Sequence, residues 1–408
     1  MAAHITLLRH AETDANASDI WQGWGDAPLT EVGQDQAARV GARLAKRSFD
    51  VVVASDLGRT TATASAAGVE AEADAAWREL EMGEWDGLAR SEIFDRFPDQ
   101  LVELRAGKDI RWGGGETYGE FTERVELAFA QLTSRLGPND HALVVTHGGV
   151  IHALVAGLLG FRSSAKAWPI GRIFNTAMTT IAIRDGSQRI EVFNDAAHLD
   201  LDSQRQHFSG PEAVLLRHGS TLANEAGQWH GLTDGPMSGS GERQAALLGE
   251  WRVDLAEIWH SPLSRARRTA EIVADGRSVP LGEDERLIEF DYGSWEDLTT
   301  AQIEEQFSEE WSRYRQGEDV PRGGTGDTTA AVSQRMSQAV MARANGEGRV
   351  GFVSHGGSIR SYVAGVLGLH PGGRFMLADL NNTSATTVAL TKRGPVLTDY
   401  NLTPHLEG

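Results

Sequence analysis

The sequence predicts two tandem three-layer α/β/α domains, each with a mostly parallel sheet and helices on both faces. Three observations lead to this prediction. The 408-residue chain carries the same ordered set of motifs twice, 208 residues apart. Within each copy, short apolar runs alternate with helix-like segments, which is typical of parallel α/β sheets. The period is also far longer than the roughly 20 to 50 residues of a solenoid unit, so each copy has the size of a domain.

The elements of the first copy alternate along the chain. Residues 5–8 predict a strand, Thr30 can cap a helix that runs to residue 44, and residues 51–54 predict a buried strand. A further strand at 143–145 precedes a helix that begins near Val150. The second copy offers strands at 214–216 and 350–353 and a helix over 244–251. Ligands of such sheets bind at the carboxyl ends of the strands.

A polar stretch at residues 200–211 separates the two copies, because turn formers collect there and apolar periodicity lapses. We therefore predict a first domain at 1–203, a linker at 204–211 and a second domain at 212–408. Each domain is long enough to bury a sizeable core. We expect the two domains to contact each other within the chain, whereas the sequence does not predict an oligomeric state.

The composition limits the partners of the protein. A formal net charge of −19 argues against nucleic acid and anionic membranes, which are bound by basic patches. No apolar run approaches the roughly 18 residues of a membrane span, and a strand near Met1 leaves no room for a signal peptide. The chain has no cysteine, which excludes disulfides and thiolate chemistry. We expect a cytoplasmic protein that acts on a small molecule.

Arginine and histidine pairs come directly after the predicted strands. In the first copy, Arg9 and His10 follow one strand, and His147 with two glycines follows another. Guanidinium groups fit the oxygens of a phosphoryl group, and a glycine-rich helix start favours an anion. The pattern predicts a site for a phosphomonoester in each copy.

The residues of this site suggest an imidazole nucleophile and give no sign of a metal or a cofactor. Neighbouring arginines disfavour protonation of His10, so a ring nitrogen stays free to attack phosphorus and form a phosphohistidine. Glu79 is placed to protonate the leaving oxygen and later to activate water. The predicted phosphate ligands are Arg9, Asn16, Arg59 and His147, and the matching set of the second copy is His218, Glu289, Arg217, Asn224, Arg265 and His355. The predicted substrate pockets contain Trp21, Gln22 and Gly23, and Trp229, His230 and Gly231.

These motifs together resemble the histidine phosphatase superfamily, which has a phosphoglycerate mutase-like fold. The resemblance rests on Arg-His near the start, Asn seven residues after that Arg, Asp-x-Pro-Leu-Thr-x-x-Gly-x-x-Gln-Ala, Ser-x-Leu-x-Arg, Glu before Gly-x-Trp, and a late His-Gly-Gly. It covers nearly all of both halves. It implies that the first histidine of each half is the phosphorylated nucleophile and that Glu79 and Glu289 are proton donors. Substrates implied by it include sugar phosphates, phosphoglycerates, cobalamin-precursor phosphates, phosphoserine and phosphoprotein side chains.

The halves also depart from the family pattern, mainly in the second copy. Ala11 replaces a glycine after the first nucleophile, and Ile288 replaces the arginine before the second donor. Asp297 stands where the first half has Gly87, and Thr325 falls near the position of Glu116. We expect both sites to be competent, with altered substrate choice or rate at the second.

Two alternatives to a phosphatase stay open. One is phosphoglycerate mutase activity, against which neither half shows the Asn-Glu-Arg-His-Tyr-Gly-like run of mutases. The other is a half that only binds phosphate and regulates, against which both halves keep the glutamate. Glu81 is a rival of Glu79 as proton donor, and segments 86–121 and 296–327 are expected to form the lids that select the leaving group.

Overall fold

The chain folds into two α/β units. The computed structural model describes residues 2–161, 169–199, 210–251, 254–275, 279–346 and 348–407. One unit comprises residues 1–168 and 172–205, and the other comprises 169–171 and 206–408. Most of the predicted linker, residues 204–209, lies outside the described residues. No helix in the described part of the chain is long and apolar enough to cross a membrane.

The sheet of the first unit has the strand order β3-β2-β4-β1-β5-β6. The first four of these strands are parallel, and β5 and β6 run antiparallel to their neighbours. The predicted mostly parallel sheet is therefore confirmed, with an antiparallel pair at one side that the sequence pattern did not predict. The strands are β1 (Ala3–Arg9), β2 (Val51–Ala54), β3 (Glu72–Ala73), β4 (His141–Thr146), β5 (Met178–Arg184) and β6 (Ser187–Asp195).

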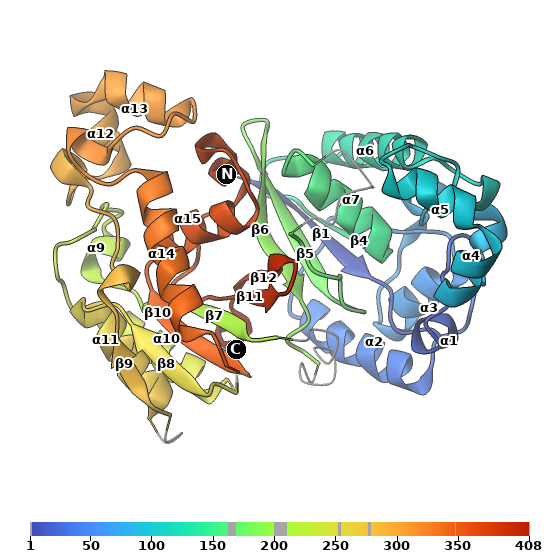
Figure 1. Cartoon of the computed structure of the whole chain (residues 1–408), viewed down its shortest axis with the longest axis horizontal. Coiled ribbons are helices and arrows are strands. Elements are labelled where there is room, and N and C mark those ends of the chain that lie inside the picture. Colours follow the sequence, from blue (N-terminus) through green and yellow to red (C-terminus); the bar gives the residue numbers. More distant parts are fainter. Residues whose placement is uncertain are drawn as a thin grey trace. The chain divides into compact units, whose positions relative to one another are not determined.

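Helices cover both faces of this sheet, as predicted (Figure 1). Leu7 and Leu8, which point to opposite faces of β1, are both fully buried, as expected for a strand between two helical layers. α2 and α3 pack on one face, through Val40 and Leu44 and through Ala64, and α6 and α7 lie on the other (Figure 1). The helices are α1 (Asp14–Ala17), α2 (Glu31–Leu44), α3 (Gly58–Ala66), α4 (Arg90–Arg96), α5 (Pro98–Arg105), α6 (Tyr118–Ser134) and α7 (Gly148–Leu158).

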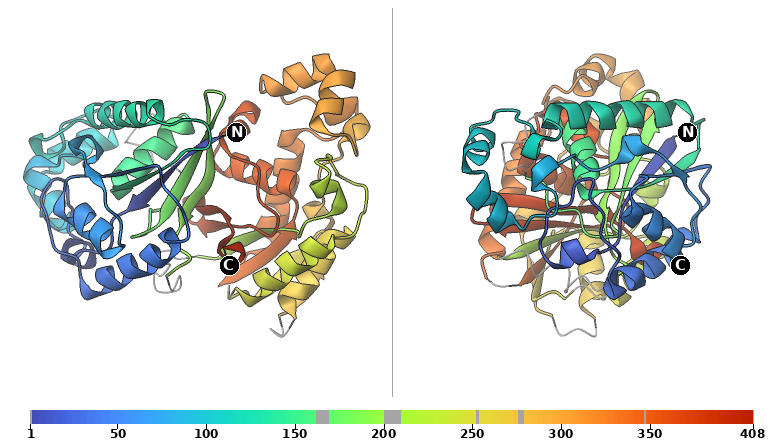
Figure 2. Two further views of the ribbon diagram at one scale, coloured as in Figure 1. Left: turned by 180° about the vertical axis from the view of Figure 1, so that it is seen from behind. Right: turned by 90° about the vertical axis from the view of Figure 1, so that its right-hand side faces the viewer.

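The second unit repeats this arrangement with the strand order β12-β11-β7-β10-β8-β9. Its β7, β8, β9 and β10 are parallel, and β11 and β12 are antiparallel. α10 and α11 pack on one face of the sheet, and α14 and α15 lie on the other (Figure 2). The elements are β7 (Glu212–Arg217), β8 (Glu257–His260), β9 (Leu281–Glu283), β10 (Arg349–Ser354), β11 (Ala385–Thr391), β12 (Gly394–Leu402), α9 (Leu222–Glu225), α10 (Gly239–Glu250), α11 (Ser264–Ala274), α12 (Thr300–Gln306), α13 (Ser308–Arg315), α14 (Thr329–Arg343) and α15 (Gly356–Val366).

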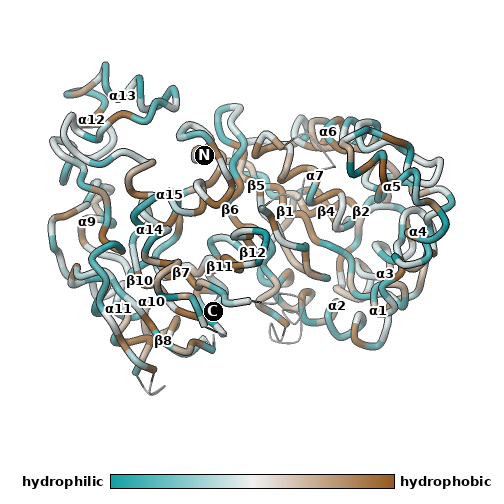
Figure 3. The backbone as a smooth tube through the Cα atoms, viewed as in Figure 1, coloured by the Kyte–Doolittle hydropathy of each residue, from teal (hydrophilic) through white to brown (hydrophobic). Residues whose placement is uncertain are grey.

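Capping residues decide where the helices begin. The hydroxyl of Thr30 accepts a hydrogen bond from the Gly33 amide, as predicted for the start of α2. The corresponding helix of the second unit, α10, begins five residues before the predicted start, because Ser238 caps it by accepting from the Gly241 amide. Hydrophobic residues are concentrated in the central strands of each unit, whereas hydrophilic residues predominate on the outer helices (Figure 3).

Each unit inserts a short helical segment between β3 and α6, or between β9 and α14, where lids were predicted. In the first unit, α4 and α5 enclose a small apolar cluster of Trp85, Ile93 and Leu101. In the second unit, α12 and α13 enclose a cluster that includes Trp295, Ile303 and Trp311. These clusters are distinct from the cores on the central sheets. Each lid therefore has packing of its own.

Candidate functional site

The carboxyl ends of β1 and β4 bring His10 and His147 together. Their rings meet edge to face with centroids 5.3 Å apart, and His10 is only 4% exposed. The second unit places His218 and His355 in the same way, with centroids 5.1 Å apart. The predicted pairs of histidines are therefore neighbours in both units.

The orientation of His10 leaves one ring nitrogen available. Its Nδ1 lies 2.8 Å from the carbonyl oxygen of Ala11, and because a carbonyl only accepts, Nδ1 carries the hydrogen. Nε2 of the neutral ring then holds a lone pair. Burial, followed by the charges of Arg9 and Arg59, places the pKa of His10 well below its usual value of 6.5. His218 is held identically by the Gly219 carbonyl at 2.7 Å, and burial with the charges of Arg265 and Arg217 lowers its pKa as well.

The arginine that precedes each nucleophile presents an unused donor. Arg9 donates from Nη1 to the Ile173 carbonyl at 2.7 Å, while its buried Nε has no hydrogen-bond partner among the described residues. Arg217 likewise donates to the Leu380 carbonyl. Its buried Nε also has no hydrogen-bond partner among the residues that the structure describes. A buried donor without a partner is costly, so these two N–H groups suit an anion.

The second arginine of each site is fixed by backbone carbonyls. Arg59 is 1% exposed and donates to the carbonyls of Gly25 at 2.8 Å and Gly23 at 2.7 Å. Arg265 donates in the same way to the Thr233 and Gly231 carbonyls. Gly23 and Gly231, predicted as pocket residues, are not among the residues that line the cavities and instead position these guanidinium groups.

His147 is fully buried and uses both ring nitrogens within the protein. Its Nδ1 accepts from Arg59 Nε at 3.2 Å, so its Nε2 carries the hydrogen that Ser55 Oγ accepts at 2.9 Å. The ring therefore orients Arg59, and the predicted contact of His147 with phosphate stays a prediction. Nε2 of His355 lies 2.8 Å from Ser261 Oγ in the same way, but its buried Nδ1 has no hydrogen-bond partner among the described residues.

Glu79 faces the nucleophile from the loop after β3. Its carboxylate accepts from the Gly149 amide at the start of α7 and from the Leu80 amide, both at 2.9 Å. Glu289 accepts equivalent bonds from Gly357 at 3.0 Å and Phe290 at 3.0 Å, and two more from the amide and hydroxyl of Ser358. Glu79 lines the cavity of the first unit and its rival Glu81 does not.

Arg124 fixes the glutamate loop of the first unit, a role the sequence did not reveal. Its guanidinium donates to the carbonyls of Arg78 and Glu79 and to the carboxylate of Glu116. In the second unit, Arg335 makes the same backbone contacts and pairs with Asp327. Asp327 therefore takes the position of Glu116, which corrects the comparison of Glu116 with Thr325.

Each unit has a cavity over these residues. The first, of about 560 Å³, is lined by His10, Arg9, Asn16, Arg59 and Glu79 and by the predicted Trp21 and Gln22. The second, of about 390 Å³, is lined by His218, Arg217, Asn224 and Glu289 and by the predicted Trp229 and His230. Residues of both predicted lids contribute to the walls, among them Trp112 and Arg322.

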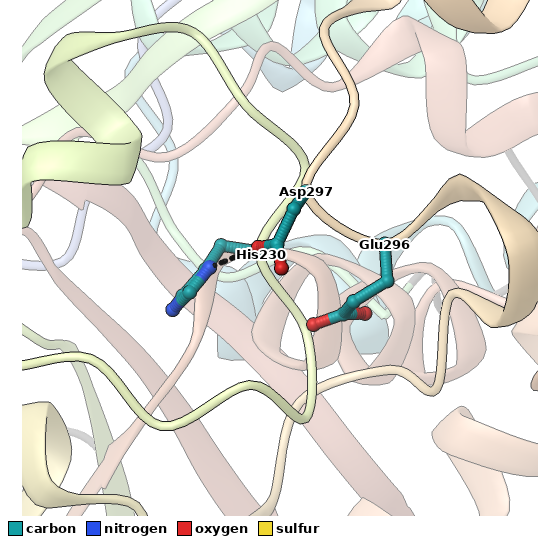
Figure 4. Close-up of side chains that lie close together, drawn as sticks. All are labelled: His230, Glu296 and Asp297. Carbon is teal, nitrogen blue, oxygen red and sulfur yellow. Dashed lines mark hydrogen bonds and ion pairs between the residues drawn. The ribbon is translucent and has the colours of Figure 1, made fainter.

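One group of described side chains is close enough to hold a metal ion, at the edge of the second cavity. Ligand atoms of His230, Glu296 and Asp297 lie within 4.8 Å of one another (Figure 4). Contacts within the protein explain why these three side chains lie close together. His230 Nδ1 pairs with Asp297 at 2.6 Å, and Glu296 accepts hydrogen bonds from the amides of Gly231 and Thr233.

The fold and the site define a class of α/β proteins that handle phosphoryl groups. The family model of the histidine phosphatase superfamily (branch 1) matches residues 5–196 and 213–403. The chain belongs to this superfamily, and its family domain occurs twice. This membership supports a function in phosphoryl transfer and confirms the predicted tandem duplication.

Several named proteins are similar to one half of the chain. A Salmonella choleraesuis protein named "Probable phosphoglycerate mutase GpmB" is 33% identical over 210 residues, which are 48% of this chain and 94% of that protein. A phosphoserine phosphatase from Entamoeba histolytica is 30% identical, covering 48% of this chain and 99% of its own, with a TM-score of 0.44. A mycobacterial glucosyl-3-phosphoglycerate phosphatase is also 30% identical, covering 47% and 98%, with a TM-score of 0.41.

Proposed function

We propose that the protein is a metal-independent phosphomonoester hydrolase with two active sites, each of which works through a phosphohistidine. The observation that carries this proposal is the orientation of His10 and His218. In each site, Nδ1 donates to a backbone carbonyl, so Nε2 keeps a lone pair next to two arginines.

The steps balance at each site, as follows for the first. Nε2 of His10 bonds to phosphorus while the bond from phosphorus to the ester oxygen breaks, and Glu79 gives its proton to that oxygen. Arg9 and Arg59 stabilise the charge on the phosphoryl oxygens. Water then attacks the phosphohistidine, Glu79 accepts a proton from the water, and inorganic phosphate leaves with His10 restored.

Phosphoglycerate mutase activity is the second candidate, because a relative 33% identical to half of this chain carries that name. A mutase returns the phosphoryl group to the substrate instead of to water, which requires water to be excluded from the phosphohistidine. The comparison of phosphate release with conversion of 3-phosphoglycerate to 2-phosphoglycerate separates the two candidates. We expect phosphate release to dominate.

The test is phosphate release from a panel of phosphomonoesters in the presence of EDTA. Wild type is compared with His10→Ala, His218→Ala and the double variant, and all four chains are checked for equal thermal stability. We expect activity in the wild type, partial or ester-specific loss in each single variant, and none in the double variant. Wild-type inactivity on every ester, loss of activity with EDTA, or an active double variant would each contradict the proposal.

The proposal also includes a cytoplasmic location and a small-molecule substrate, both from the sequence. Two competent sites are part of it as well, because each unit keeps the nucleophile, both arginines and the glutamate. A silent, phosphate-binding second unit would show itself as a His218→Ala variant with unchanged activity on every ester.

A further inference from the structure

We infer that the two sites have diverged in the leaving group they accept: the first takes phosphomonoesters of apolar alcohols, and the second takes phosphomonoesters of alcohols with several hydroxyl groups. This inference rests on the proposed function and names the substrate class of each site. Because the two units repeat one fold, several wall positions of one cavity can be matched with wall positions of the other.

Backbone contacts that the two units share fix the counterparts. Ile20 pairs with Ala89, and Gln228 makes the same bridge to Thr299. Met82 and Tyr292 each precede the short helical turn after the glutamate. Trp112 and Arg322 each begin the turn of the lid. His152 and Arg360 each hold the fifth position of the helix that follows the second histidine, α7 or α15.

At each of these positions the second cavity carries the more polar side chain. Ile20, Met82 and Trp112 line the first cavity, and Gln228, Tyr292 and Arg322 line the second. The fourth pair follows the same trend, because burial lowers the pKa of His152 to about 4 and leaves it uncharged, whereas Arg360 is a cation. Four independent changes in one direction indicate a change in what the wall contacts.

One of the changed positions lies beside the candidate proton donor of the second site. Tyr292 lies beside the proton donor, since a Cβ added at Gly357 would meet both Tyr292 Oη at 3.0 Å and Glu289 Oε1 at 2.8 Å. In the first unit, Met82 lines the same cavity as Glu79. The second site therefore has a hydroxyl group beside its candidate proton donor, and the first cavity has a thioether at the corresponding position.

The first cavity continues into an apolar wall. The rings of Trp21 and Trp112 stack with centroids 5.7 Å apart, and Phe121, Leu80 and Ile173 continue this apolar part of the lining. Polar side chains, among them Asp19, Tyr118 and Arg172, line the rest of the cavity. A wall of this kind gains free energy by removing apolar surface of a ligand from water. This apolar part offers no side-chain partner to a hydroxyl group, so a hydroxyl buried against it would lose its hydrogen bonds to water.

The second cavity pairs donors with acceptors along its wall. Arg360 forms an ion pair with Asp379, and both residues line the cavity. His230 lines it as well and pairs with Asp297 at 2.6 Å. A hydroxyl group both donates and accepts, so it can bond to either member of such a pair. The carboxylate of Asp379 offsets the charge of Arg360, which favours neutral hydroxyl groups over a further anion beside this pair.

Asp297 pairs with His230 although its backbone has a conformation that residues with a side chain rarely adopt. Its φ is +60°, a region that disfavours side chains, and its counterpart Gly87 has a φ of +80°. The first unit thus has the residue the backbone prefers, and the second has the residue that binds His230 and Thr233.

The test compares two esters of matched shape, cyclohexylmethyl phosphate and glucose 6-phosphate, in chains with one working site. His218→Ala reports the first site and His10→Ala the second. The selectivity ratio is kcat/KM for the cyclohexylmethyl ester divided by kcat/KM for the sugar ester. We expect this ratio to be at least about tenfold higher at the first site, since hydrophobic and hydrogen-bonding contacts typically discriminate at this level or above.

Exchange variants then assign the selectivity to the wall. Ile20→Gln should lower the ratio at the first site, and Gln228→Ile should raise it at the second. Tyr292→Phe should also raise it at the second site, because the ring stays and only the hydroxyl is lost. The matched control is Val32→Gln in α2, which is 54% exposed and does not line the first cavity, and which should leave the ratio unchanged.

Three results would overturn this inference without touching the proposed function: equal ratios at the two sites, exchange variants that behave like the control, or faster turnover at the second site of a matched carboxylate, trans-4-carboxycyclohexylmethyl phosphate, than of the sugar ester. The last result would make the polar wall an anion site. By contrast, an absence of phosphate release, or release by the double histidine variant, would refute the proposed function itself.

Discussion

Gly149 in α7 is where the backbone comes closest to the candidate proton donor. A Cβ added there would lie 2.1 Å from Oε1 of Glu79, so Gly149→Ala must displace the carboxylate. We expect kcat of the first site to fall by about 100-fold, the scale of a lost general acid. The measurement is phosphate release in a His218→Ala chain.

Gly157 of the same helix supplies the control. An added Cβ there meets only Oε1 of Glu126, at 3.3 Å. Gly157→Ala should keep kcat and raise the free energy of unfolding by about 0.5 to 1 kcal/mol, because alanine favours a helix. Equal kcat values in the two alanine variants would argue against Glu79 as the donor.

The side chains that the sequence revealed are those that recur in order in both halves. His10, Arg59 and Glu79 could be predicted because their neighbours in the chain repeat with them. Arg124 could not, because its contacts with the carbonyls of Arg78 and Glu79 come from a helix distant in sequence. The hydrogen bonds of His147 could not be predicted for a similar reason, since only the fold shows that Arg59 and Ser55 use both of its nitrogens.

Among the elements, the lid of the first unit should unfold separately from the sheet. Ile93 of α4 is 2% exposed and packs in the lid cluster with Trp85 and Leu101. Ile93→Ala should destabilise this cluster by about 2 to 5 kcal/mol. We expect faster amide hydrogen exchange in α4 and α5 with unchanged protection in β1.

Val102 of α5 is the matched control, since it is 63% exposed. Val102→Ala should leave exchange in the lid nearly unchanged. If Ile93→Ala accelerated exchange in β1 as much as in α4, the lid and the sheet would be one cooperative unit.

The pattern of elements shows where sequence reasoning succeeds. Strand β2 (Val51–Ala54) was predicted to the residue, because a buried parallel strand is a continuous apolar run. The other predicted strands are present but extend one or two residues beyond the predicted ranges at each end. The hairpin of β5 and β6 was missed, since its residues carry no contrast between apolar and polar faces strong enough to mark two strands. The pair also depends on a long-range partner, because β5 lies against β1.

For the whole molecule, the buried histidines predict a loss of stability in acid. Burial, with nearby arginines, holds the pKa values of His10, His147, His218 and His355 well below 6.5. Below pH 6.5 the unfolded chain binds protons that the folded chain does not, so the free energy of unfolding falls as pH falls. Each histidine contributes up to about 1.4 kcal/mol per pH unit.

The measurement is urea unfolding from pH 7.5 to pH 5.5, together with NMR of the histidine rings. We expect the four site histidines to stay neutral at pH 5.5. His4 is an internal contrast, because its hydrogen bond to Glu191 raises its pKa, so it should gain its proton above pH 6.5. Stability that is independent of pH over this range would show that the site histidines are not neutral in the folded protein.

The two family domains on one polypeptide also have a consequence for the cell. Residues 5–196 and 213–403 are translated together, so every molecule supplies both sites in a ratio of one to one. Changes in expression or degradation then scale both capacities equally. The sequence of each cavity wall and the supply of each substrate then set the balance between the two domains.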